Sequence, residues 1–213
     1  MSRIIIIGGH GKVALLLTPL LAGRGDEVTS VVRKQEHLEE VAMAGAAPVL
    51  ADIETMDTAA LAELLSGHDA IVWSAGAAGD HTRTYSVDRD AAIRTMDAAR
   101  TAGVSRYVMV SYSGASVNHG VPESDPFYAY AEAKAAADEH LRASGLDYTI
   151  LGPSSLTLDP ASGTIAVTGD RGTVSRGNVA SVIAESLVQA TTIGKTVEFI
   201  DGDVPIVEAL AAV

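Results

Sequence analysis

Residues 4–17 read IIIIGGHGKVALLL and join an apolar run, a glycine-rich turn and a second apolar run. Four consecutive isoleucines are typical of a strand that is buried on both faces, as in a parallel sheet. The segment from Lys12 to about Ala22 has the length and apolar content of a helix. A strand, a glycine turn and a helix in this order begin a βαβ unit, so the stretch predicts an α/β fold.

The composition is that of one globular domain. The chain has 213 residues, of which 47% are hydrophobic and 20% are charged, and domains usually span about 100 to 200 residues. The formal net charge of −12 opposes non-specific binding to nucleic acids and to anionic membranes. No cysteine is present, which excludes disulfides, thiolate metal ligands and a cysteine nucleophile.

Neither a membrane span nor a targeting segment is expected. No apolar run reaches the roughly 18 residues that cross a bilayer, and the N-terminus lacks the cationic region and cleavage site of a signal peptide. The histidines lack the H-x3-H and H-E-x-x-H spacings, so no metal is expected. We therefore expect a cytoplasmic protein, monomeric or homodimeric.

Short β-branched runs alternate with longer Ala/Leu-rich segments along the rest of the chain. The predicted strands cover residues 3–8, 27–33, 47–52, 69–76, 104–111, 147–152 and, last, 196–201. The predicted helices cover residues 12–22, 36–45, 56–67, 85–103, 130–145 and 178–190, and residues 164–175 read as a hairpin. Apolar strands separated by helical crossovers predict a doubly wound parallel sheet in a single α/β domain. Residues from about 152 to 213 would contribute its substrate side.

The glycines of the opening stretch have the spacing of a phosphate-binding turn. Gly8, Gly11 and Ala14 occupy the positions of a G-x-x-G-x-x-A pattern. Glycine lets a phosphate approach the backbone, and the open N–H groups at the helix start attract it. Lys12 would add a cation. The alternative is a tight structural hinge, which also favours glycine.

The end of the second strand indicates which cofactor the turn would hold. An acidic residue there would bind the 2′-hydroxyl of NAD, whereas this strand ends in Val32, Arg33 and Lys34. Asp26 and Glu27 lie at the opposite end of the strand. The pattern favours NADP, with Arg33 on the 2′-phosphate; NAD remains possible, and the two cations could simply be solvated.

Two further strand ends carry candidate cofactor contacts. Asp52, after the third strand, could accept a hydrogen bond from the adenine amino group or could be an ordinary turn residue. The fourth strand ends in SAGA, residues 74–77. Large side chains there would fill the crevice in which a cofactor lies.

Tyr130 and Lys134 are the candidate catalytic pair. They lie four residues apart in a predicted helix and so share one face. A lysine ammonium near the phenol would lower its pKa from about 10 and fit it for proton transfer to or from an oxygen. Ser111 and Ser113 are the first candidates for the hydroxyl that polarises a carbonyl, and turn serines are the alternative.

The order of these motifs resembles the atypical short-chain dehydrogenase/reductases of the NAD(P)H-binding type. Small bacterial NAD-dependent epimerase/dehydratase-like proteins are the nearest relatives implied; biliverdin/flavin reductase and NmrA-like proteins are more distant. The segments that carry the resemblance are GGHGKVA (8–14), VVR (31–33), SAGA (74–77), VMVSYSGAS (108–116), YAEAKAAADEHLRASGLDYTILGP (130–153), SRGNVASVIAESL (175–187) and TIGKTVEFID (192–201). The resemblance implies a Rossmann fold that binds NADP, with Pro153 beside the nicotinamide.

The chain departs from the family pattern at three places. The usual G-A-T-G turn is G-G-H-G, the usual R-P-G after strand six is Gly152, Pro153 and Ser154, and Asn178 replaces the aspartate of R-x-D-V-A in the segment that begins at Arg176. The missing arginine leaves one cation fewer near the substrate, so the substrate does not follow from the family.

The candidate site therefore combines a cofactor side and a catalytic side. The cofactor-binding residues are Gly8, His10, Gly11, Lys12, Val13, Arg33, Asp52, Ile53, Ala75, Gly76, Ala77, Tyr130, Lys134 and Pro153, and the catalytic residues are Tyr130, Lys134, Ser111 and Ser113. An NADP-dependent oxidoreductase acting on a small carbonyl, quinone or flavin-like acceptor is the first hypothesis. A non-catalytic NAD(P)-binding sensor is the second, and a sugar-nucleotide epimerase or dehydratase is the third, because few residues remain for a substrate domain.

Overall fold

The strands and helices of the chain alternate along its first 153 residues. The computed structural model describes residues 1–77, 80 and 82–213. The strands are β1 Arg3–Ile7, β2 Glu27–Val32, β3 Ala47–Leu50, β4 Ala70–Trp73, β5 Arg106–Val110, β6 Asp147–Pro153, β7 Ser155–Thr157, β8 Thr164–Val167, β9 Thr173–Ser175, β10 Lys195–Asp201 and β11 Val204–Pro205. The α-helices are α1 Lys12–Gly23, α2 Leu38–Met43, α3 Thr58–Leu65, α4 Ala92–Ala102, α5 Tyr128–Ala143, α6 Arg176–Ser186 and α7 Ile206–Ala211. Shorter helical segments are η1 Gln35–His37, η2 Tyr85–Ala91, which is a π-helix, and η3 Ala190–Thr192.

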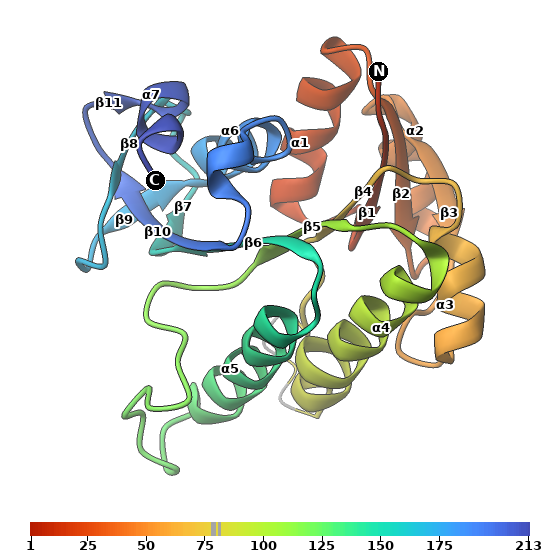
Figure 1. Cartoon of the computed structure of the whole chain (residues 1–213), viewed down its shortest axis with the longest axis horizontal. Helices are drawn as coiled ribbons and strands as arrows, with labels where there is room; N and C mark the ends of the chain where they lie inside the picture. Colours follow the sequence, from red (N-terminus) through yellow and green to blue (C-terminus); the bar gives the residue numbers. More distant parts are fainter. Residues whose placement is uncertain (78–79, 81) are drawn as a thin grey trace.

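Nine of the described strands form one sheet in the order β11-β8-β10-β6-β5-β4-β1-β2-β3 (Figure 1). Every pair from β3 through to β10 is parallel, and β8 and β11 add an antiparallel edge. The predicted doubly wound α/β fold is therefore confirmed. Among the described residues, no helix has the length and hydropathy that crossing a membrane requires.

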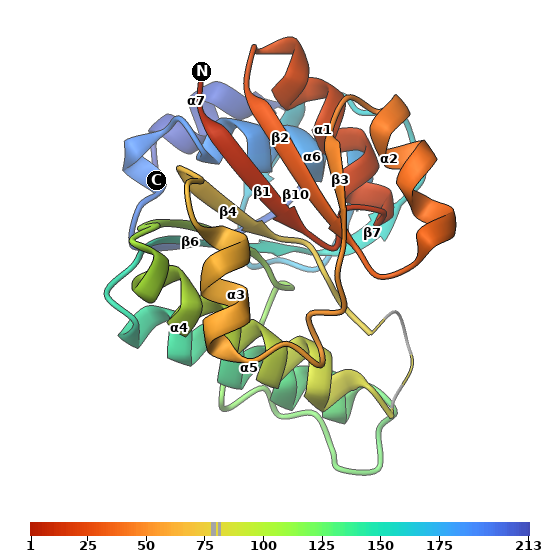
Figure 2. The ribbon, with the colours of Figure 1, turned by 90° about the vertical axis from the view of Figure 1, so that its right-hand side faces the viewer.

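The opening isoleucines are buried because helices cover both faces of the sheet. Ile4 and Ile6 pack with α1, α2, α6 and α7, whereas Ile5 and Ile7 pack with α3, α4 and α5. Successive strand residues point to opposite faces, so an uninterrupted apolar run supplies one core on each side. Figure 2 shows the two helical layers on either side of the sheet.

The sheet changes its direction of winding at β1. The connection through α1 leads from β1 to β2 on one side, and the connection through α3 returns to β4 on the other side of β1. In open α/β sheets, ligands bind at the carboxyl ends of the strands where this reversal occurs. The candidate site is therefore expected beyond Ile7 and Trp73, the last residues of β1 and β4.

The C-terminal third differs from the prediction in two respects. Residues 164–175 do not form a hairpin: β8 pairs with β10 and β11, and β9 pairs in parallel with β7. The chain bends at Gly169 and Asp170 between the two strands, but β8 belongs to the nine-stranded sheet and β9 to the two-stranded sheet. In addition, β10 is followed by β11 and α7, so it is not the last element.

Candidate functional site

Three cavities follow the carboxyl ends of the strands. The turn cavity, about 270 Å³, lies between the glycine turn and the ends of β2 and β3. The central cavity, about 900 Å³, lies between the glycine turn, the end of β4 and the start of α5. The loop cavity, about 620 Å³, lies between the β5–α5 loop and residues 153–155 and 169–172.

These cavities collect the predicted residues, with the exception of Lys134. The turn cavity is lined by Gly8, His10, Gly11, Arg33, Asp52, Ile53, Ala75 and Gly76. The central cavity shares several of these and adds Lys12, Val13, Ala77, Ser111 and Tyr130. Ser113 and Pro153 line the loop cavity instead, where the Ser113 N–H donates to the Pro153 carbonyl at 3.0 Å. The serine that shares a cavity with Tyr130 is thus Ser111.

The contact with β4 requires a glycine in this turn, and the start of α1 that follows it is open to a ligand. Gly8 has a φ of +88°, and a Cβ there would lie 2.6 Å from the Ala75 backbone. Gly11 precedes α1, and no side chain caps the helix start. The first N–H groups of α1 therefore remain open toward the cavities, as an anion site at a helix N-terminus requires. The contact with β4 agrees with the hinge interpretation, and phosphate binding by these glycines stays a prediction.

Two arginines line the turn cavity, and they differ in their partners. Arg83 donates through Nε to Glu54 at 2.9 Å, and Ser86 binds the same carboxylate. These two hydrogen bonds lower the pKa of Glu54, so the charge of Arg83 is compensated. Arg33 is exposed and, within the described part of the chain, forms no ion pair with a carboxylate. Arg33 is therefore the cation that a bound anion would meet.

Asp52 lines the same cavity and also serves the local turn. Its Oδ1 accepts the Glu54 N–H at 3.2 Å, which is the ordinary role of an aspartate after a strand. The ligand contact and the turn are compatible, because the carboxylate has a second oxygen.

Lys134 is fully buried and does not reach the cavity side of α5. Its Nζ donates to the Val110 carbonyl at 2.8 Å and lies 3.2 Å from the Met109 Sδ. The expectation that Lys134 lowers the pKa of Tyr130 is wrong: burial raises it well above 10, and Asp88 and Asp138 raise it further. Burial lowers the pKa of Lys134 itself, and the charges of Asp138 and Asp88 offset part of this effect.

Asp88, Lys134 and Asp138 together place two carboxyl groups and one ammonium inside the protein, each at most 1% exposed. Asp88 Oδ2 accepts the Ala77 N–H at 3.0 Å, and Asp138 Oδ2 accepts the Ser111 hydroxyl at 2.5 Å. Burial raises the pKa of both aspartates, and Lys134 offsets part of this effect. Asp88 also lines the central cavity, so a titratable carboxyl group faces the site beside Tyr130.

Sequence reasoning missed Asp88, although a signal was available. Asp88 stands three, four and seven residues before Ala91, Ala92 and Thr95, all of which are buried. An acidic residue on the buried stripe of a predicted helix is unusual unless it has a partner or a function. Its position in the π-helical segment η2 agrees with the frequent occurrence of such segments at functional sites.

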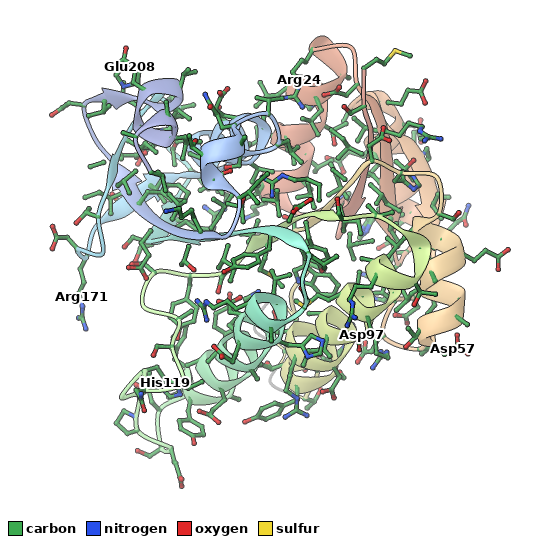
Figure 3. All side chains as sticks on the ribbon, in the orientation of Figure 1. Arg24, Asp57, Asp97, His119, Arg171 and Glu208 are labelled. Atoms are coloured by element: carbon green, nitrogen blue, oxygen red, sulfur yellow. The ribbon has the colours of Figure 1, made fainter. Side chains whose placement is uncertain are left out.

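Aromatic rings separate the central cavity from the loop cavity. The ring centroids of Tyr112, Phe127 and Tyr130 lie 5.1–5.6 Å apart, and Phe127 is 41% exposed. Figure 3 shows His119 on the β5–α5 loop and Arg171 on the segment between β8 and β9, on the same side of the molecule. His119 is bound to Glu132 at 2.8 Å. The wall of the site thus offers an aromatic surface of tilted rings, with Arg171 lining the loop cavity and Arg176 the central cavity.

The departure at Asn178 has a local cause. Its Nδ2 donates to Asp201 at 2.6 Å and to Ser162 at 2.8 Å, and its Oδ1 accepts the Gly163 N–H. An aspartate at this fully buried position would set one carboxylate against another. The neighbouring Arg176 lines the central cavity and donates to the carbonyls of residues 156 and 157.

Known proteins resemble this chain over its whole length. The protein-family model described as NAD(P)H-binding matches residues 8–190. A Bacillus subtilis protein named as an uncharacterized sugar epimerase is 36% identical and covers 98% of each chain. The structure of a Bacillus halodurans protein, named as a candidate NAD-dependent epimerase/dehydratase, has a TM-score of 0.91, 32% identity and full coverage of both chains. An oxidoreductase from Lactococcus lactis has a TM-score of 0.90 and 29% identity, with 99% of this chain and 96% of that chain covered.

Proposed function

Since the chain belongs to the NAD(P)H-binding family, we propose that it is an NADP-dependent oxidoreductase that transfers hydride to a small carbonyl, quinone or flavin-like acceptor. The observation that carries the cofactor choice is Arg33, an exposed cation at the end of β2 that lines the turn cavity. An unpaired guanidinium there favours a 2′-phosphate, which it can bind through two parallel hydrogen bonds.

The glycine turn fits the pyrophosphate of such a cofactor. The position that a Cβ of Gly11 would take is only 3.2 Å from the Gly8 carbonyl oxygen, so a side chain at this position would crowd the turn. The uncapped start of α1 supplies N–H groups, and Lys12 adds a cation at the central cavity. The small residues Ala75, Gly76 and Ala77 keep the end of β4 open for the nicotinamide half.

The acceptor side is proposed to supply a proton. When bound, the nicotinamide supplies the hydride. The raised pKa of Tyr130 keeps its phenol protonated at neutral pH, so Tyr130 Oη can donate a proton to a developing alkoxide but cannot readily act as a base. The rings of Tyr112 and Phe127 would orient a planar acceptor. The Ser111 hydroxyl donates its proton to Asp138 and could therefore only accept a hydrogen bond from the acceptor.

Cofactor titration of the wild type and of Arg33→Ala tests this proposal. NADPH should bind the wild type at least about tenfold more tightly than NADH, and Arg33→Ala should remove that preference, since one charge-assisted hydrogen bond is worth roughly a factor of ten. Lys34→Ala is the matched control, because the Lys34 ammonium is paired with Glu36 at 3.2 Å. Equal binding of NADPH and NADH to the wild type would contradict the NADP assignment.

A nucleotide-binding sensor is the second candidate, and the burial of Lys134 favours it. Without the ammonium beside the phenol, Tyr130 and Lys134 do not form an activated pair. Tight NADPH binding without turnover across a panel of carbonyl, quinone and flavin acceptors would support the sensor. The epimerase named among the relatives is a third candidate; oxidation of a sugar hydroxyl needs a base, and the raised pKa of Tyr130 speaks against that role.

A further inference from the structure

Two histidine rings are stacked at the entrance of the turn cavity. His10 belongs to the glycine turn and His37 to η1, which follows β2. Their ring centroids lie 3.5 Å apart, and the ring planes differ by 8°. Both side chains are about one-quarter exposed and line the same cavity as Arg33. The stack thus joins the phosphate turn to the segment that carries Arg33.

The charged groups around the stack favour one protonated ring rather than two. Glu40 of α2 accepts a hydrogen bond from His10 Nε2 at 2.7 Å, and a Glu36 carboxylate oxygen lies 3.7 Å from His37 Nε2. Lys34 opposes a charge on His37. Lys12 follows His10 at the start of α1, and the charged residues that line the cavity with the stack are Arg33, Asp52 and Arg83. Two imidazolium rings in face-to-face contact would repel, whereas one imidazolium on a neutral ring is attracted.

Resting on the proposed NADP site, we propose that His10 and His37 bind the 2′-phosphate together with Arg33, and that the stacked pair takes up one proton from solvent when they do so. His37 follows Arg33 closely in the sequence, and His10 lines the central cavity as well as the turn cavity. The pair therefore lies between the proposed site of the 2′-phosphate and the proposed site of the pyrophosphate. A phosphate dianion would accept a hydrogen bond from the imidazolium edge.

The sign of the pH dependence follows from the free protein. Burial and the neighbouring His10 lower the pKa of His37, so the ring is neutral above about pH 6.5 before a ligand binds. A bound phosphate favours the charged ring and raises that pKa. Binding therefore takes up a proton, and NADPH affinity must rise as pH falls toward the pKa of the free ring. NADH lacks the 2′-phosphate and should show little of this effect.

The test is a fluorescence titration with NADPH and with NADH between pH 8.5 and pH 6.5, on the wild type and on His37→Phe. The wild-type Kd for NADPH should fall about threefold to fivefold over this range, as expected for a pKa that lies at or slightly below 6.5 in the free protein and that binding raises by about one unit. In His37→Phe, which keeps an aromatic ring on His10, the Kd should stay within about twofold. Calorimetry in two buffers of different ionisation enthalpy should detect proton uptake in the wild type and none in the variant.

His140→Gln is the control, because His140 lies on α5 and pairs with Asp97 on the far side of the sheet; its NADPH profile should match the wild type. A His37→Phe profile as steep as that of the wild type would overturn the role of the stack. An equally steep NADH profile would overturn the assignment to the 2′-phosphate. Failure of the wild type to bind either cofactor would instead contradict the proposed function itself.

Discussion

Tyr130 illustrates how far spacing can be trusted at the scale of single residues. The four-residue spacing predicted that Tyr130 and Lys134 lie on one face of α5, but it did not predict how deeply each side chain is buried. The buried residues of this helix are mostly alanines, and Lys134 is buried with them, where its Nζ donates to the carbonyl of Val110. Asp88, whose charge acts on Lys134, lies 46 residues earlier, beyond the reach of any local pattern. The residue types of the site were thus predictable, and their charge pairing was not.

Replacement of Tyr130 by phenylalanine should separate binding from chemistry. The hydroxyl is lost while the ring keeps its contacts with Tyr112 and Phe127. We expect NADPH affinity within about twofold of the wild type and a rate of NADPH-dependent reduction about 100-fold lower, the usual contribution of a positioned proton donor. The measurement is turnover of an acceptor found by screening, with Tyr112→Phe as the control. An undiminished rate would remove Tyr130 from the mechanism and leave Asp88 as the carboxyl group that could supply a proton in the central cavity.

At the scale of elements, strands were predictable where the sequence of the segment itself determines its place in the sheet. The apolar runs of β1, β2, β4, β5 and β6 can only be central strands, because helices must cover both of their faces. The strands β8 and β9 are too short to decide their pairing, and alternative partners were available after the turn at 168–172. The glycine-rich sequence therefore predicted correctly that the chain breaks between the two strands, but the predicted pairing of these strands with each other was wrong.

Gly8→Ala should test whether the glycine turn depends on contact with β4. Gly8 and Gly25 have nearly the same backbone angle, with φ of +88° and +89°, but a Cβ at Gly25 would have no heavy atom within 4 Å. Gly25→Ala should lower the free energy of unfolding by about 1 to 2 kcal/mol through the left-handed backbone alone. Gly8→Ala should cost about 2 kcal/mol more, because the Cβ would overlap the Ala75 backbone.

Urea denaturation measures both variants, and NADPH titration should show weakened binding in Gly8→Ala only. Equal losses of stability in the two variants would mean that the β4 contact relaxes at no cost. In that case the glycine is required for its conformation and not for close approach.

At the scale of the whole molecule, the acidic surface and the buried charges act in different pH ranges. The formal net charge is −12, and exposed carboxylates are ionised above about pH 5. The pKa values of Asp26, Glu54 and Asp80 are lowered by their hydrogen bonds, so these groups add stability above the ordinary carboxyl pKa and lose it as pH falls. Between pH 5 and pH 8 the remaining dependence comes from His37, whose pKa is lowered by burial, and from the buried groups Asp88 and Asp138.

The buried aspartates should make the protein less stable as pH rises through this range. A carboxyl group whose pKa is raised by burial holds its proton more tightly in the folded state. Its contribution is therefore complete below the unfolded pKa of about 3.9 and is lost as pH rises through the folded pKa. Asp88→Asn removes one such group and keeps an oxygen for the Ala77 N–H. We expect the free energy of unfolding of Asp88→Asn to decline between pH 5 and pH 8 by about 1 kcal/mol less than that of the wild type, while Glu63→Gln, an exposed change on α3, follows the wild type. Parallel curves for Asp88→Asn and the wild type would mean that Asp88 is already ionised at pH 5 and that Lys134 compensates its charge fully.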